Sequence, residues 1–211
     1  MAFVITESNG VAYIDVSNGA DINAALTALE SHVATSANVA SGVVNVTAST
    51  QFSEALIGRD NVTLNINDGV TLTLSTALTR PAAYTLTNTV NSGLTGSGTL
   101  DVNGNADYGV FGAAADNVAI GNVHGTGANP AMLTILGWKY GVAIVSTAAE
   151  AAENVLINNL QLLDPAGSDV QFPILISNRP TLNGQWVENV TIDNVLIDGG
   201  HLGPGGIRTG G

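Results

Sequence analysis

Four ionisable residues near the end of the chain are the best candidates for catalysis. Asp164 and Asp198 lie ten and nine residues after the Asn of two successive sequence repeats, so stacked repeats would place their carboxylates at neighbouring turns. His201 and Arg208 follow shortly after Asp198. Arg208 could neutralise a uronate or act as a base, while the aspartates could donate a proton or hold a cation such as calcium. Alternatively, both aspartates only mark turns, because Pro-Ala-Gly and Gly-Gly follow them.

Aromatic residues form the candidate substrate-binding group. Trp138, Lys139 and Tyr140 are consecutive, and Trp186 falls where a neighbouring repeat would lie. Aromatic rings present apolar faces that can stack on sugar rings, so this group could contact a polysaccharide. The alternative is packing at the base of a loop or at a subunit contact, where aromatic residues are also enriched.

A five-residue phrase that recurs four times must position these residues. It consists of an acidic residue, Asn, Val, any residue, and Leu or Ile, and it starts at Asp60, Asp116, Glu153 and Glu188. Its asparagines are separated by 56, 37 and 35 positions. The two shorter intervals fit one coil each and the longest fits two. Repeats at such intervals indicate a stacked architecture.

The surrounding pattern divides the chain into two expected parts. Residues 1–41 contain two short entry strands around a turn at 8–10, then a helix starting at Asp21 whose apolar residues follow helical spacing. This helix would cap the first coil. Residues 42–211 contain short apolar strands separated by Gly, Asn and Asp turns. This pattern predicts an all-β fold, a single-stranded parallel β-helix whose interior is filled by Val, Ile and Leu.

A second set of asparagines is expected to form an internal ladder. Asn122, Asn159 and Asn194 each lie five residues after an Asn of the phrase, so they should stack. Asparagine tolerates the left-handed backbone of tight corners and can bond its neighbours. We therefore expect these three residues to be buried and structural.

Composition limits the partners of the chain. The net charge is −12 with only five Lys and Arg, so binding to nucleic acid or to anionic membranes is disfavoured. The chain has no cysteine and no apolar run long enough to span a bilayer. Its first residues lack the basic and apolar segments of a secretory signal, so we expect none. No metal or cofactor is indicated, apart from the calcium considered above.

The opening of the chain resembles the pectate-lyase-like right-handed β-helix superfamily. The resemblance rests on Asp21-Ile-Asn-Ala-Ala-Leu, on Gly42-Val-Val-Asn-Val, and on the long segment starting Asp60-Asn-Val-Thr-Leu-Asn-Ile-Asn-Asp-Gly. It implies a right-handed coil and a superfamily of polysaccharide lyases, polygalacturonases, epimerases and phage tailspikes. His201 and Arg208 match fragments of the polygalacturonase His and Arg-x-Lys elements. However, no paired aspartates precede them and no Lys follows Arg208.

The low charge and the abundance of Asn and Thr look most like a phage appendage protein. The resemblance therefore implies a tailspike-like protein of a virion or cell surface that engages polysaccharide, assembled as a homotrimer, with other virion or surface subunits as further partners. One alternative is a purely structural decoration or spacer. Another is a fragment of a polysaccharide lyase or glycoside hydrolase, for which we expect residues 1–211 alone to be inactive. The chain stops partway through an expected coil, so we expect it to continue beyond 211 or to be covered by another subunit.

Overall fold

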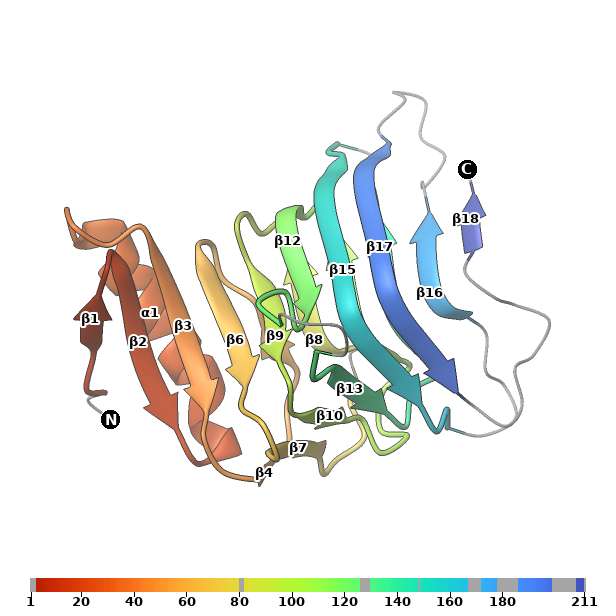
Figure 1. Ribbon diagram of the computed structural model, residues 1–211, viewed down its shortest axis with the longest axis horizontal. Coiled ribbons are helices and arrows are strands. Elements are labelled where there is room, and N and C mark those ends of the chain that lie inside the picture. The colour runs from red at the N-terminus through yellow and green to blue at the C-terminus, as the bar shows by residue number, and fades with distance from the viewer. Residues whose placement is uncertain are drawn as a thin grey trace.

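The computed structural model describes residues 3–79, 82–125, 130–147, 149–166, 172–177, 186–198 and 208–210. Short strands follow one another along the chain, with one long helix near the N-terminus (Figure 1). The helix is α1 (Ile22–Thr35), preceded by a 3-10 turn η1 (Gly19–Asp21). The strands are β1 (Thr6–Ser8), β2 (Val11–Val16), β3 (Ser41–Val46), β4 (Thr50–Phe52), β5 (Leu56–Ile57), β6 (Val62–Ile66), β7 (Thr71–Leu74), β8 (Ala82–Thr87), β9 (Gly93–Gly96), β10 (Thr99–Asp101), β11 (Tyr108–Ala113), β12 (Asp116–Gly121), β13 (Leu133–Leu136), β14 (Tyr140–Val145), β15 (Ala152–Leu163), β16 (Phe172–Ser177), β17 (Val187–Asp198) and β18 (Arg208–Gly210).

Strict alternation of apolar and polar residues explains why these segments form strands with one buried face. In β6, Val62, Leu64 and Ile66 are fully buried, whereas the two residues between them face outward. Successive side chains of a strand point to opposite faces, so this pattern buries one face in the core and leaves the other to solvent. The inward residues of successive strands form one continuous hydrophobic core.

The strands assemble into two sheets. The first has 12 strands in the order β1-β2-β3-β6-β9-β12-β15-β13-β10-β7-β4, with β17 also paired to β15. The second has six strands in the order β18-β16-β14-β11-β8-β5. The named strand pairs are parallel except β1 with β2, which form the expected hairpin.

The predicted closed β-helix is therefore wrong as a description of the whole architecture. The described strands form a mixed sheet and a second parallel sheet in a sandwich-like arrangement with one helix, and no closed solenoid is observed among them. The physical reason lies in β15, which is 12 residues long. Its first half pairs with β12 and its second half with β13, so two rows of strands expected as separate faces join in one bent sheet.

The predicted in-register stacking of the repeat phrase is confirmed. Val118 pairs with Val155, and Val155 pairs with Val190, all in parallel. The phrase at 60–64 lies two strands earlier, because β9 is inserted between β6 and β12. Equivalent phrase positions therefore form rows that run across the first sheet.

The helix covers the core at the N-terminal end of the first sheet (Figure 1). Ile22, Ala25, Leu26 and Leu29 are fully buried, as their helical spacing predicts. Asp21, where the helix was expected to start, precedes α1 and makes no capping hydrogen bond with its side chain. In the part of the chain that the structure describes, no helix is long and apolar enough to cross a membrane.

Candidate functional site

A groove on the outer face of the first sheet is the best candidate site. It has a volume of about 450 Å³ and crosses five neighbouring strands. Strand residues Tyr13, Val43, Thr63 and Ala119 line it, together with Val123 and His124 from the loop after β12. In Figure 1 this loop passes in front of β9, and the lining residues show that it forms one wall of the groove.

The groove is hollow because the row of outward positions along it ends in two small residues, Gly93 and Ala119. Tyr13, Val43, Thr63, Gly93 and Ala119 are aligned across five strands. A Cβ atom at Gly93 would lie 2.2 Å from the carbonyl oxygen of Ala119, so only glycine allows the two strands to approach this closely. The row therefore has larger side chains at one end and a depression at the other.

Asn122 holds the loop that forms the wall. Its side-chain Nδ2 donates to the carbonyl oxygen of Ala131 at 2.6 Å and so ties together the two ends of the loop. Its carbonyl oxygen accepts a hydrogen bond from the Gly125 amide at 3.0 Å, and its own amide donates to the Asn159 carbonyl at 3.3 Å. These bonds fix where Val123 and His124 lie relative to the sheet.

A ladder of asparagine side chains borders the groove along one edge of the sheet. Asn91 Nδ2 donates to Asn61 Oδ1 at 2.7 Å, and Asn117 Nδ2 donates to Asn91 Oδ1 at 2.5 Å. All three residues have positive φ, between 51° and 58°. Asn189 Nδ2 donates likewise to Asn154 Oδ1 at 3.2 Å further along the sheet. The phrase asparagines are thus corner residues, a role that the sequence reasoning missed although their recurrence before each strand was the available signal.

Asparagine side chains that bond one another also form the floor of the groove. Asn65 Nδ2 donates to Asn45 Oδ1 at 3.1 Å and to Asn67 Oδ1 at 2.7 Å. Thr95 Oγ1 approaches Asn65 Oδ1 at 3.5 Å. Because these side chains bond one another, they form a rigid polar surface.

Four polar groups of the groove remain available to a ligand. They are the hydroxyls of Tyr13 and Thr63, the Oδ1 atom of Asn117 and the imidazole of His124, none of which bonds another residue in the described part of the chain. Together they supply both donors and acceptors. No charged side chain lines the groove. The groove can therefore bind a ligand rich in hydroxyl groups through hydrogen bonds.

Sequence reasoning assigned the groove residues no role. A usable signal did exist for Thr63 and Ala119. Both occupy the variable fourth position of the repeat phrase, between inward Val and Leu or Ile, so they had to share an outward row. Nothing in the sequence indicated that Tyr13, from the first hairpin, would join them.

The described residues include only part of the predicted catalytic set. Leu163 pairs with Asp198, so the exposed carboxyl groups of Asp164 and Asp198 belong to neighbouring strand ends, as expected. Asp164 also occupies a left-handed turn with φ 45°, which agrees with the turn alternative. The backbone of Arg208 lies in β18 of the second sheet, and His201 lies outside the described residues. No group of three or more His, Cys, Asp or Glu that could hold a metal occurs among the described residues.

The predicted substrate-binding residues do not form one aromatic surface. Trp138 is 0% exposed, so its ring packs in the core and cannot stack on a sugar, which corrects the substrate-binding assignment. Lys139 Nζ lies 2.8 Å from Asp107 Oδ1. The Tyr140 ring stacks on Tyr108 with centroids 4.5 Å apart. Trp186 is 55% exposed just before β17 and is the one member of the set with a largely free ring.

The predicted internal ladder has a clear centre at Asn159. Asn159 is 4% exposed with φ 52°, and its Nδ2 donates to the Asn122 carbonyl at 2.8 Å. Asn194 Nδ2 donates to Asn159 Oδ1 at 2.6 Å. Burial of all three was expected, but Asn122 is half-buried and Asn194 is exposed. Asn194 lies in β17, which pairs only with β15 among the described strands.

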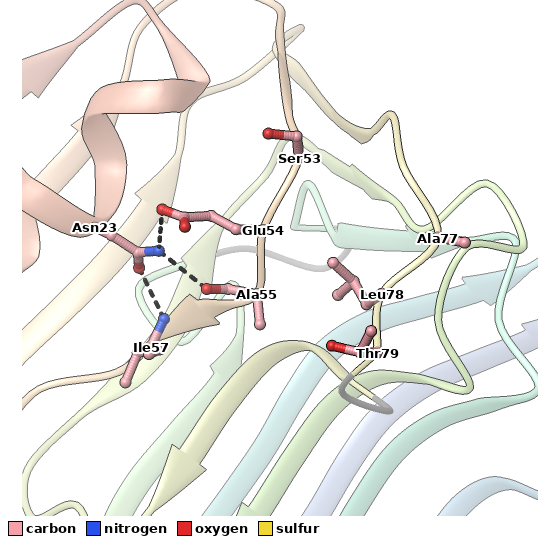
Figure 2. Close-up of a pocket in the computed structure, with 8 residues that line it drawn as sticks. All are labelled: Asn23, Ser53, Glu54, Ala55, Ile57, Ala77, Leu78 and Thr79. Atoms are coloured by element: carbon pink, nitrogen blue, oxygen red, sulfur yellow. Dashed lines mark hydrogen bonds between the residues drawn. The ribbon is translucent and has the colours of Figure 1, made fainter.

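A second pocket, of about 370 Å³, lies between α1 and the loops at 53–57 and 77–79. Figure 2 shows Asn23 reaching from the helix to the first loop. Its Nδ2 donates to Glu54 Oε1 at 3.0 Å and to the Ala55 carbonyl at 2.9 Å, and its Oδ1 accepts from the Ile57 amide at 3.0 Å. The amide at the pocket wall is therefore fully used in holding the loop, which makes this pocket the weaker candidate.

Comparisons with known proteins give little guidance. No protein-family model matches the chain, and a comparison with curated proteins finds no significant match. One similar solved structure is a proposed glycosyl hydrolase from Parabacteroides merdae. The similarity covers 86% of this chain and 91% of that chain, with 14% identity and a TM-score of 0.47. At this level, the similarity establishes neither a shared fold nor a shared activity.

Proposed function

We propose that the protein binds a polysaccharide in the groove on the outer face of its first sheet. The observation that carries this proposal is the set of four free polar groups on a rigid, uncharged surface. Sugar hydroxyls both donate and accept hydrogen bonds, and so do these groups taken together. A tailspike-like role on a virion or cell surface, with a trimeric assembly, stays a prediction from the sequence resemblance.

The dimensions of the groove suit an extended chain of sugars. Neighbouring strands lie about 4.8 Å apart, so the four steps from Tyr13 to Ala119 span ~19 Å across the sheet. Such a length accommodates several sugar units lying across the strands. The amides that border the groove are already bonded to one another, so little side-chain ordering is required on binding.

Binding of the wild-type chain to a panel of soluble polysaccharides, measured by isothermal titration calorimetry, tests the proposal. Thr63→Val removes one hydroxyl at nearly constant shape and should weaken binding about 2–10-fold, the equivalent of ~0.5–1.5 kcal/mol. Ala119→Leu should weaken binding more strongly because it fills the depression. Thr191→Val is the matched control, since Thr191 belongs to the same outward row but lies two strands beyond Ala119 and does not line the groove.

Two results would refute the proposal. One is that wild-type protein binds no polysaccharide of the panel. The other is that Thr63→Val and Ala119→Leu bind as tightly as Thr191→Val. The first result would favour the second candidate function, a structural spacer or decoration, which the mutually bonded asparagine ladders and the low charge density also suit.

A further inference from the structure

We infer that the groove selects uncharged polysaccharides over those that carry carboxylate or sulfate groups. This inference rests on the proposed binding function and adds the class of sugar. It comes from the distribution of charge around the groove, which is independent of the hydrogen-bonding groups that support binding itself.

Among the described residues, no Lys or Arg side chain lines the groove. The strands β2, β3, β6, β9 and β12 contain no Lys or Arg, and neither does the loop at 122–131. Arg59 Nε lies 3.9 Å from Glu30 Oε2, and Lys139 Nζ lies 2.8 Å from Asp107 Oδ1. The groove therefore lacks the charge-assisted hydrogen bonds with which proteins usually bind carboxylates.

Carboxylates lie beside the groove instead. Asp15 accepts a hydrogen bond from Asn45 Nδ2 at 2.9 Å, in the row that continues to Asn65 on the groove floor. Asp116 directly precedes Asn117 and accepts a hydrogen bond from Asn154 Nδ2 at 3.0 Å. A sugar carboxylate in the groove would therefore lie near two carboxylates of a chain whose net charge is −12. Like charges repel, and this repulsion is not offset by any cation in the lining.

Desolvation acts in the same direction. A charged group that leaves water for a site without a counter-charge loses far more hydration than a hydroxyl does. The free groups of the groove can replace the hydration of sugar hydroxyls, but they include one acceptor-only oxygen, Asn117 Oδ1, which repels a carboxylate. The test is made at pH 8, at which histidine side chains are ordinarily neutral.

The experiment compares neutral polysaccharides with their C6-oxidised polyuronate counterparts, which have the same linkages. Wild-type protein at pH 8 and low salt should bind the neutral polymer at least tenfold more tightly. Ala119→Lys places an ammonium group in the depression and should increase polyuronate affinity at least tenfold, an effect that high salt removes. Thr191→Lys is the control with the same change of net charge outside the groove. Thr63→Lys serves as the second variant if Ala119→Lys proves to be unfolded by circular dichroism.

Each outcome is informative. Preference of wild-type protein for the neutral polymer, together with the gain in the groove variant alone, supports the inference. Equal or tighter binding of wild-type protein to the polyuronate overturns the inference but leaves polysaccharide binding intact. Equal gains in Ala119→Lys and Thr191→Lys would assign the selectivity to overall charge and also overturn it. Binding to neither polymer class overturns the proposed function itself.

Discussion

Replacing Asn159 by alanine should destabilise the protein by about 3 kcal/mol. The substitution leaves two partners of the buried amide without their hydrogen bonds, namely the Asn122 carbonyl and Asn194 Nδ2. Loss of a buried hydrogen bond costs ~1–3 kcal/mol. Alanine must also adopt the native φ of 52°, and the left-handed conformation costs an ordinary L-residue roughly 1–2 kcal/mol. The lower value of about 1 kcal/mol for each of the two part-buried bonds and about 1 kcal/mol for the backbone together give the expected loss.

Two further variants separate these contributions. Asn159→Gly removes the amide but tolerates positive φ, so it should be less destabilised than Asn159→Ala by about 1 kcal/mol. Asn158→Ala is the matched control, because Asn158 is the preceding residue of the same strand and its buried Oδ1 has no partner among the described residues. Removing an unpartnered buried acceptor should leave stability unchanged or raise it.

Urea unfolding followed by tryptophan fluorescence is a suitable assay, because Trp138 is fully buried in the native protein. With an m-value near ~2 kcal/mol/M, the Asn159→Ala midpoint should fall by roughly 1.5 M. A loss below ~0.5 kcal/mol in Asn159→Ala, or an equal loss in Asn158→Ala, would refute the assignment of Asn159 as the centre of a stabilising ladder.

Further predictions concern packing, pH dependence, chemistry and assembly. Gly93→Ala should lower the thermal midpoint more than Gly69→Ala, and calorimetry can measure both midpoints. A Cβ at Gly93 meets the Ala119 carbonyl at 2.2 Å, whereas at Gly69 nothing lies within 4 Å and only the φ of 70° opposes alanine. Burial raises the pKa of Tyr84 well above its unfolded value of about 10. Stability that depends on neutral Tyr84 should therefore be complete below pH ~10 and be lost as pH rises further, an alkaline loss that Tyr84→Phe should reduce. Residues 1–211 alone should release no reducing or unsaturated ends from any polysaccharide tested; turnover abolished by both Asp198→Ala and Arg208→Ala would contradict this. The sequence resemblance predicts a trimer, and a stable monomer at micromolar concentration in light scattering would count against it.

Residue spacing was sufficient to predict the local structure and the stacking. Alternation of Val, Leu and Ile with Thr and Asn defines the inward and outward faces of β6, and the repeat phrase predicted the register of β12, β15 and β17. The spacing of Ile22, Ala25, Leu26 and Leu29 likewise predicted the buried face of α1. These features depend on residues that are close in sequence or strictly periodic, so they can be predicted from one sequence.

The composition also determined part of the functional conclusion. Only five basic residues occur in the chain, and none lies in the five strands that form the groove. This distribution disfavours anionic partners whatever the fold. The sequence could not indicate which polar residues remain free, because most of its asparagines bond one another across neighbouring strands.

Tertiary structure decided how the strands join and where a ligand can bind. The continuation of β15 past the corner at Asn159 merged two rows of strands into one sheet, an outcome that depends on pairing with both β12 and β13. Burial of Trp138 depends likewise on which elements close around it. Tyr13, Thr63 and His124 line one groove because successive strands pair in register and Asn122 holds the loop after β12. Its depth depends on the different side-chain volumes of neighbouring strands, so it is defined only once these strands have paired.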